Sequence, residues 1–163
     1  MEDMMEFQEA ECGVRVRAVI ERQGADVLVQ LVGGDVPHYG VVVTVDRAGE
    51  VRGIALPSRP GHVHQETAIA EPLARRLHAA LLTAGANEKR KEGAEGADDS
   101  PLAAGNVMVV SGVHVNAITP EQMRAVFRMC ERLGTRAADW LERHPIGAPE
   151  EVFASLPDRA ASK

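Results

Sequence analysis

The sequence is poor in aromatic residues and in cysteine. Aromatic side chains make up 3% of its 163 residues, with one tryptophan, one tyrosine and three phenylalanines. The cysteines, Cys12 and Cys130, are too few for a disulfide framework and lack the Cys-x-x-Cys spacing of a metal site. Cys130 falls on the apolar face of a predicted helix, where we expect a packed free thiol. This cysteine usage favours a cytoplasmic protein.

Long apolar runs and an excess of positive charge are also missing. No apolar run approaches the roughly 18–20 residues that cross a bilayer, which argues against a membrane protein. Residues 1–6 are acidic and lack the cationic and apolar regions of a secretory signal. The net charge of −6 argues against a general nucleic-acid binder, because neutralising phosphates requires a basic face. A small local anion site is still compatible with this charge.

The composition, 45% hydrophobic and 26% charged, is ordinary for one globular domain. Residues 1–10 are expected to be frayed or weakly helical. Beyond them, alternating or β-branched apolar residues predict four strands, at residues 12–20, 25–32, 41–45 and 51–56. The stretch 41–45 contains only valine and threonine, which suits a central strand covered on both faces.

Two amphipathic helices and a fifth strand follow. The first helix is expected to start near residues 63–66. Residues 107–110 are the predicted fifth strand. The second helix starts at Thr119-Pro120, because threonine is a good cap and proline is favoured at the first helical position. It is expected to end before Pro145.

The element order ββββ-α-β-α predicts an α+β fold in two layers. We expect a largely antiparallel five-stranded sheet with two amphipathic helices on one face. Residues 1–163 form a single domain whose core covers about residues 12–144. Residues 87–105 are charged and almost free of large apolar side chains, which predicts a mobile insertion. Residues 145–163 are a proline-punctuated tail.

Three polar corners, at residues 33–40, 57–62 and 111–116, each combine glycine with histidine at a strand end. If these strands are neighbours, the corners converge at one edge of the sheet. Two corners lead into a helix N-terminus, where free N–H groups and the helix dipole favour an anion. Glu66 adds a carboxylate beside the second corner. The candidate binding residues are Gly33, Gly34, Asp35, His38, Ser58, Arg59, Gly61, His62, Ser111, Gly112, His114 and Asn116.

Three interpretations of the corners are open. The first is a phosphate-bearing ligand held by glycine backbone and helix N-termini, with the histidines and Arg59 as donors. The second is a metal site made by His38, His62 and His114, or by His62 with His64, because three histidines suit zinc or iron. In the third, each histidine caps a strand or helix and each glycine only turns the chain.

The corners resemble a known family. The segments Gly33-Gly34-Asp35-Val36-Pro37-His38-Tyr39-Gly40, Pro60-Gly61-His62 and Gly112-Val113-His114 occur in the order and spacing of the LpdD-like prenylated-flavin chaperone family. The resemblance covers about residues 12–135 and implies a compact single domain. Small proteins of that family are associated with UbiD-type decarboxylases of aromatic acids, whose cofactor is prenylated FMN. The resemblance implies that this chain binds or delivers prenylated FMN or FMN and does not itself catalyse a reaction.

The chain departs from the family's pattern at three places. Val63 stands where a lysine is expected after Gly-His, which removes a cation for the phosphate. The segment Val115-Asn116-Ala117 stands where an aspartate is expected after His114, so a neutral amide replaces a charged group. Residues 87–105 are an added segment.

We therefore expect a cytoplasmic accessory protein that delivers a prenylated FMN-type cofactor to a UbiD-type decarboxylase. No compact nucleophile–base pair in the sequence demands an enzyme. A flat ring would need aliphatic walls, with Tyr39 as its chief stacking partner. The alternative is a metal-dependent hydrolase, or another metal-binding protein, that uses His38, His62 and His114. A further interpretation is a homo-oligomeric module, such as a homodimer, whose corners form the interface.

Overall fold

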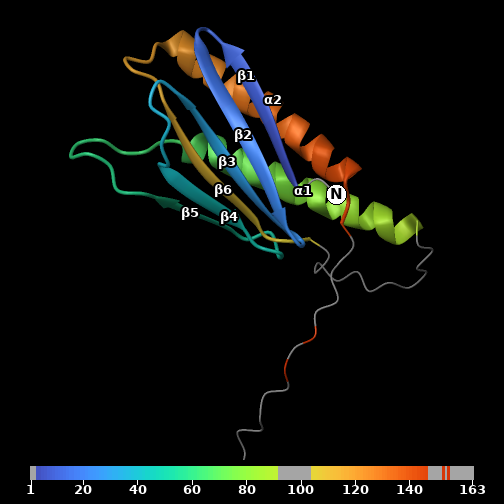
Figure 1. Ribbon diagram of the computed structural model, residues 1–163. Coiled ribbons are helices and arrows are strands. Elements are labelled where there is room, and N and C mark those ends of the chain that lie inside the picture. Colours follow the sequence, from blue (N-terminus) through green and yellow to red (C-terminus); the bar gives the residue numbers. More distant parts are fainter. Residues whose placement is uncertain (1–2, 92–103, 147–151, 153, 155–163) are drawn as a thin grey trace, which may run out of the picture.

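A computed structural model describes residues 3–91, 104–146, 152 and 154, with the backbone alone for Lys89 and Lys91. The chain forms one sheet and two long helices (Figure 1). The strands are β1 (Met4–Glu11), β2 (Val14–Gln23), β3 (Asp26–Gly34), β4 (Val41–Val45), β5 (Val51–Ala55) and β6 (Val107–His114). The helices are α1 (Thr67–Lys91) and α2 (Pro120–Arg143).

The six strands lie in the order β1-β2-β3-β6-β4-β5. β6 pairs in parallel with β3, and the other four strand pairs are antiparallel. The predicted α+β class is confirmed, but the prediction of five strands was wrong, and the sheet is mixed. The parallel pair arises because the crossover through α1 returns the chain between β3 and β4, instead of adding β6 to an outer edge.

Both helices pack on the same face of the sheet, as expected (Figure 1). Alternate residues of the central strands point toward them and are fully buried, among them Val29, Val43 and Val109. Leu77 of α1 and Leu133 of α2 close the core from the other side and are also fully buried. Each such side chain contributes about 1.5–3 kcal/mol through burial, so this interface is the main source of stability.

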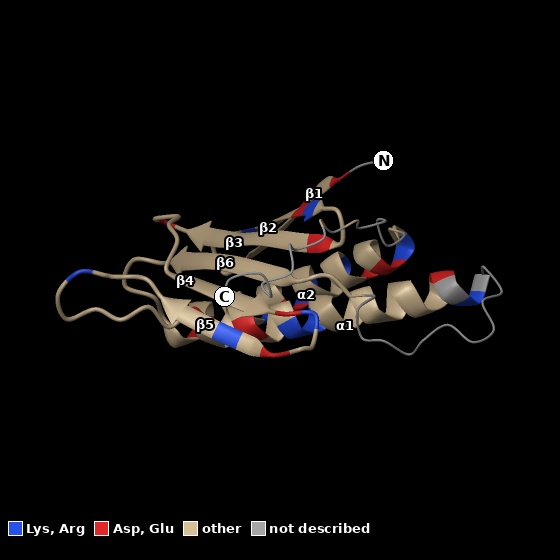
Figure 2. Ribbon diagram, turned by 90° about the horizontal axis from the view of Figure 1, so that it is seen from below, with Lys and Arg blue, Asp and Glu red and all other residues tan. Residues whose placement is uncertain are grey.

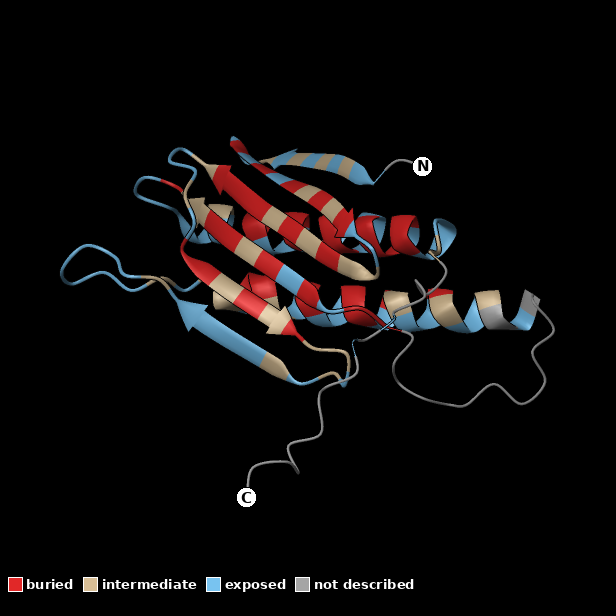
Figure 3. Ribbon diagram, turned by 60° about the horizontal axis from the view of Figure 1, so that its bottom comes forward, coloured by how far each residue is buried: buried red, intermediate tan, exposed pale blue. Residues whose placement is uncertain are grey.

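The opposite face of the sheet, which we call the open face, is not covered by any described element (Figure 3). Along β4 the valines that point to the helices are buried, whereas Val42 and Thr44 are only half-buried. The prediction that residues 41–45 are covered on both faces is therefore met on one face only within the described part of the chain. β4 is nevertheless an interior strand, between β6 and β5.

The prediction that residues 1–10 are frayed or weakly helical is wrong for the described part of this stretch, because β1 occupies Met4–Glu11. β1 is tied to α2 by a group of ion pairs that we call the ionic seam. Glu9 pairs with Arg132 at 2.8 Å and with Arg136 at 3.0 Å, and Glu11 pairs with Arg132 at 3.0 Å and with Arg128. The hydrogen bond from Arg132 is the main reason why the pKa of Glu9 is lowered.

The second helix begins where the sequence predicts. Thr119 caps it: the threonine hydroxyl accepts from the Gln122 N–H at 3.1 Å, and the Gln122 side chain accepts from the Thr119 N–H at 3.0 Å. Cys130 is buried on this helix, as predicted, and burial raises the pKa of its thiol to about 12.

The prediction of a mobile insertion at residues 87–105 is wrong for residues 87–91. α1 starts at Thr67, just after the predicted region, and continues to Lys91, so residues 87–91 belong to a helix. Residues 92–103 and most of the predicted tail at 145–163 lie outside the described residues. Neither of the two described helices is long and apolar enough to span a membrane.

Candidate functional site

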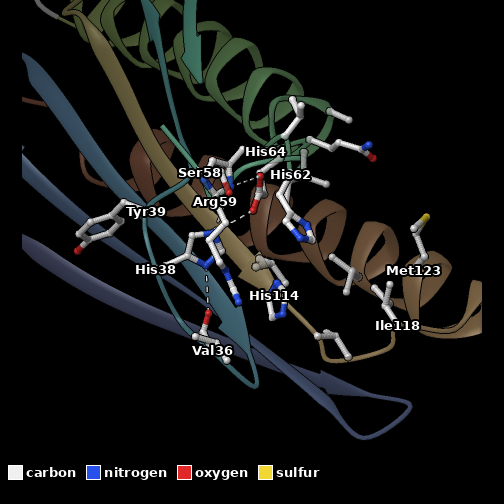
Figure 4. A pocket seen from close by; sticks show the side chains of 18 of the residues that line it. Val36, His38, Tyr39, Ser58, Arg59, His62, His64, His114, Ile118 and Met123 are labelled. Atoms are coloured by element: carbon white, nitrogen blue, oxygen red, sulfur yellow. Dashed lines mark hydrogen bonds and ion pairs between the residues drawn. The ribbon is translucent and has the colours of Figure 1, made fainter. Parts of the chain in front are cut away.

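The parallel pairing of β3 and β6 brings the first and third corners together. Gly34 at the end of β3 lies opposite His114 at the end of β6. The segment between β5 and α1, which contains the second corner, reaches the same edge (Figure 4). An open cavity of about 940 Å³ lies there, lined by all three corners and by residues near the N-terminal ends of α1 and α2.

Two glycines allow the corners to approach each other this closely. Gly34 has φ = +79°, and a Cβ on it would overlap the carbonyl of His114. A Cβ on Gly112 would overlap the carbonyl of His38, so the first corner crosses directly over β6. The crossing is held by several hydrogen bonds, among them those from the Asp35 N–H to the His114 carbonyl at 2.7 Å and from the Gly40 N–H to the Ser111 carbonyl at 2.8 Å. The Asn116 N–H also donates to the Asp35 carboxylate at 2.8 Å.

At the polar end of the cavity lies what we call the histidine–glutamate cluster, made of His38, His64 and Glu66. His38 Nε2 lies 3.3 Å from His64 Nδ1 and 3.3 Å from Glu66 Oε1. His64 Nδ1 lies 3.5 Å from Glu66 Oε2. The His64 and Glu66 side chains are only 13% and 11% exposed. Each of the three residues therefore offers one potential metal-ligand atom, and these three atoms lie within 4.8 Å of one another among largely buried side chains.

The hydrogen bonding of the cluster is incomplete among the described residues. His38 Nδ1 lies 3.1 Å from the Val36 carbonyl, which can only accept, so this nitrogen carries the hydrogen and the lone pair of neutral His38 is on Nε2. That lone pair points toward His64 and toward the Glu66 carboxylate, which is itself only an acceptor when ionised. Glu66 Oε2 is buried without a hydrogen-bond partner. With His38 Nε2 as an acceptor, His64 Nδ1 donates the hydrogen between the two rings. One hydrogen then serves His38 Nε2 and both Glu66 oxygens, and this excess of acceptors favours a cation.

The structure places five of the twelve predicted binding residues on the cavity wall, namely His38, Ser58, Arg59, His62 and His114. The three histidines predicted as a metal site do not form the cluster. His62 is exposed, and His64 takes the place beside His38. His114 is a neighbour, its ring centroid 6.2 Å from that of His38, but its Nε2 faces the Asn116 side-chain oxygen at 3.2 Å.

The remaining predicted residues support the cavity or lie apart from it. Asp35, Asn116, Gly34 and Gly112 make the crossing described above. Of the other three, Gly33 lies in β3 against the Arg15 carbonyl, and Gly61 is an exposed glycine in a turn. Ser111 is fully buried.

The helix starts are less available to an anion than expected. At α2 the Gln122 N–H is taken by the cap residue, and at α1 two N–H groups donate to the Glu66 carbonyl.

His64 was predicted only as an alternative metal ligand with His62, and Glu66 only as a carboxylate beside the second corner; neither was among the twelve predicted binding residues. The signal for them is their spacing: in an extended segment, alternate residues point to the same side, so positions 62, 64 and 66 share one side. The other contribution that sequence reasoning missed is an apolar wall from α2. Met123 and Phe127, 46% and 44% exposed, face the cavity together with Val126.

A two-layer α+β domain with one polar and one apolar wall around a cavity of this size is the architecture of a small-molecule-binding protein. The chain belongs to the family described as the prenylated flavin chaperone LpdD-like domain, whose model matches residues 10–85 and 100–142. It is 28% identical over 150 residues to Protein LpdD of Lactiplantibacillus plantarum, an alignment that covers 92% of this chain and 94% of that protein. The family resemblance of the corners is thus confirmed.

Proposed function

We propose that this protein binds a prenylated FMN-type cofactor in the cavity and delivers it to a UbiD-type decarboxylase, without catalysing a reaction of its own. The observation that carries the proposal is the cavity of about 940 Å³ with a polar and an apolar end, in a chain of the flavin chaperone family. Cavities that enclose cofactor-sized ligands measure about 300–1,000 Å³.

The apolar end suits the ring system. Met123, Val126 and Phe127 offer aliphatic and aromatic surface to a flat ligand. Tyr39, the expected stacking residue, points away from the histidines (Figure 4), and its hydroxyl donates to the Gln30 side chain at 2.9 Å. Stacking on the ring therefore falls mainly to Phe127 and the aliphatic wall.

The polar end suits a phosphate or the polar edge of the ring. Among the described lining residues Arg59 is the one lysine or arginine. No second cation therefore takes the place of the lysine that the family pattern has at position 63. His62 and His114 supply further donors. A site with one exposed cation and few stacking rings holds its ligand weakly enough to release it, as delivery requires.

The test is a titration with FMN and with prenylated FMN, followed by absorbance and by the melting temperature. We expect saturable binding of prenylated FMN with a rise in Tm. Phe127→Ala and Arg59→Ala should weaken binding, whereas Arg75→Ala, an exposed arginine of α1 outside the cavity lining, should not. No response to either flavin would exclude the proposal.

Delivery needs a separate measurement. Cofactor-loaded protein is mixed with a cofactor-free UbiD-type decarboxylase, and the appearance of decarboxylase activity is compared with that after adding the same amount of free cofactor. Faster or more complete activation by the loaded protein supports delivery. Equal activation by free cofactor contradicts it while leaving cofactor binding intact.

A second candidate function, metal binding, is favoured by the histidine–glutamate cluster. His38, His64 and Glu66 offer two imidazoles and one carboxylate, a ligand set that suits zinc or iron and leaves a coordination position open for water, as a hydrolase would need. Metal analysis of untagged protein tests this. Less than about a tenth of an equivalent after incubation with zinc and desalting counts against a metal site, because three preorganised ligands should retain the ion.

A further inference from the structure

We propose that the open face of the sheet is the interface of a homodimer, in which a second copy of the chain packs sheet against sheet. This surface lies on the face of the sheet turned away from α1 and α2. The first corner borders it at one end, where the Tyr39 hydroxyl donates to the Gln30 side chain at 2.9 Å.

The first observation is the composition of the open face. Seven apolar side chains on five strands point away from the helices, namely Val19, Leu28, Val32, Val42, Ile54, Met108 and Val110. Val32 is buried, and the other six are half-buried or exposed. Met108 is 44% and Ile54 66% exposed. β3, β4 and β6 carry no lysine or arginine and no acid apart from Asp26 at the start of β3, so the centre of the sheet is free of charge (Figure 2). Solvated sheet faces are normally polar, and parallel strands are normally covered on both sides.

The second observation is the register, which arranges this face in two rows across β2, β3, β6, β4 and β5. One row reads Val19, Gln30, Val110, Val42, Ile54. The next reads Glu21, Leu28, Met108, Thr44, Arg52. β6 is the middle strand of these five. The second row begins with a negative charge, Glu21 of β2, and ends with a positive charge, Arg52 of β5.

Under a two-fold axis along β6 these rows face their own copies, and every facing pair except Gln30 with Val42 is compatible. Such an axis places β2 of one copy over β5 of the other. Met108 and Val110 then meet their counterparts, Val19 faces Ile54, and Glu21 faces Arg52 at both ends of the interface. A self-complementary patch is what a two-fold dimer requires. Arg52 is free to change partners, because its present one, Glu50 at 3.3 Å, is a highly exposed neighbour on the same strand.

The flat area of the face approaches the size that a stable interface requires. Five strands at about 4.8 Å spacing and about 3.3 Å per residue give roughly 500–600 Å² of flat area, before side-chain relief is counted. A stable interface buries about 800 Å² per partner, and two packed sheets aligned within about 30° bury their facing side chains in full.

Sedimentation equilibrium of the full chain tests the proposal. We expect a species of twice the 17.5 kDa chain mass at micromolar concentrations. Met108→Glu, which introduces two charges near the axis, should give a monomer with an unchanged far-ultraviolet circular dichroism spectrum. Leu82→Glu places the same charge on a residue of α1 that is 40% exposed, and it should leave the dimer intact.

A charge swap distinguishes this arrangement from any other dimer. Arg52→Glu should weaken dimerisation roughly tenfold, since each dimer loses two exposed ion pairs and gains two repulsions. Glu21→Arg combined with Arg52→Glu should restore it. A monomeric wild type would overturn the proposal and point to another protein or another part of this chain as the cover. A dimer that survives Met108→Glu, or a double variant that is not restored, would overturn it as well.

Discussion

The ionic seam and the histidine–glutamate cluster both bring carboxylates and basic side chains together, but only the seam is complete in itself. In the seam, two carboxylates face three arginines, and the arginine hydrogen bonds lower the pKa of Glu9 and of Glu11. In the cluster, one carboxylate faces two imidazoles, and Glu66 Oε2 has no hydrogen-bond partner among the described residues. The seam lies between two elements of the fold, whereas the cluster lies on a cavity wall.

The two charge groups of this molecule differ in whether their members satisfy one another's hydrogen bonds, and this separates a structural group from a binding group. A charge group whose members satisfy one another stabilises the fold and offers nothing to a ligand. A group that is buried and unsatisfied costs stability, and it is retained when something from outside completes it. Variants in the seam should therefore change stability alone, and variants in the cluster should change binding alone.

The largest effect is expected from Gly112→Val, because it attacks the crossing that builds the cavity. The new side chain would overlap the His38 carbonyl, so the first corner would have to move off β6. We expect a loss of about 3 kcal/mol in the free energy of unfolding, together with loss of flavin and zinc binding. Urea unfolding and titration measure the two. Normal binding by a folded Gly112→Val protein would show that the crossing does not position the site.

Glu66→Gln should affect binding without affecting the fold. The amide keeps the size of the side chain but loses the charge that attracts a cation, so zinc affinity should fall at least about tenfold. Tm without zinc should be unchanged or higher, because no hydrogen bond to Glu66 Oε2 is lost. Calorimetric titration with zinc and a melting curve provide both values. A marked drop in Tm of the metal-free protein would instead place Glu66 among the structural residues.

Arg132→Gln should affect the stability of the fold without affecting binding. It removes a 2.8 Å pair with Glu9 and a 3.0 Å pair with Glu11, which attach β1 to α2. Because these pairs are partly exposed, we expect only a few degrees of decrease in Tm and unchanged binding of flavin and zinc. Arg75→Gln, which touches only the exposed Glu71 one turn earlier, is the control and should leave Tm nearly unchanged.

The smallest effect is a pH dependence of the seam. The pKa of Glu9 is lowered in the folded protein from its ordinary value of 4.5, mainly by the Arg132 hydrogen bond. Its stabilising contribution is therefore present above about pH 4.5 and is lost as the pH falls through the lowered folded pKa. Glu9→Gln should have a lower Tm than wild type at neutral pH, and the difference should shrink as the pH falls below 4.5 and through the lowered folded pKa. A difference that stays constant with pH would show that the carboxylate is not responsible.

Much of the fold could be predicted, because local patterns coincide with tertiary structure there. The apolar alternation of β2 and the threonine–proline start of α2 each depend on residues that are close together in the chain. β1 could not be predicted from its sequence. Its helix-facing acids, Glu9 and Glu11, look like solvated charges until the arginines of α2 are placed opposite them.

The same division holds for the site. Glycine and histidine at three strand ends predicted the corners that line the cavity, since close backbone approach and polar strand ends are visible in the sequence. The choice of His64 over His62 was not visible, because no local pattern distinguishes these two neighbouring histidines. It is decided by which ring meets His38 across the crossing over Gly112.

The sequence by itself determined the two layers, the amphipathic helices and the three corners that surround the cavity, because each depends on residues close together in the chain. Only the tertiary structure decided that β6 enters between β3 and β4, that His38, His64 and Glu66 converge, and that one apolar face of the sheet stays open. Each of these depends on contacts between residues far apart in the chain, whose partners no local pattern specifies.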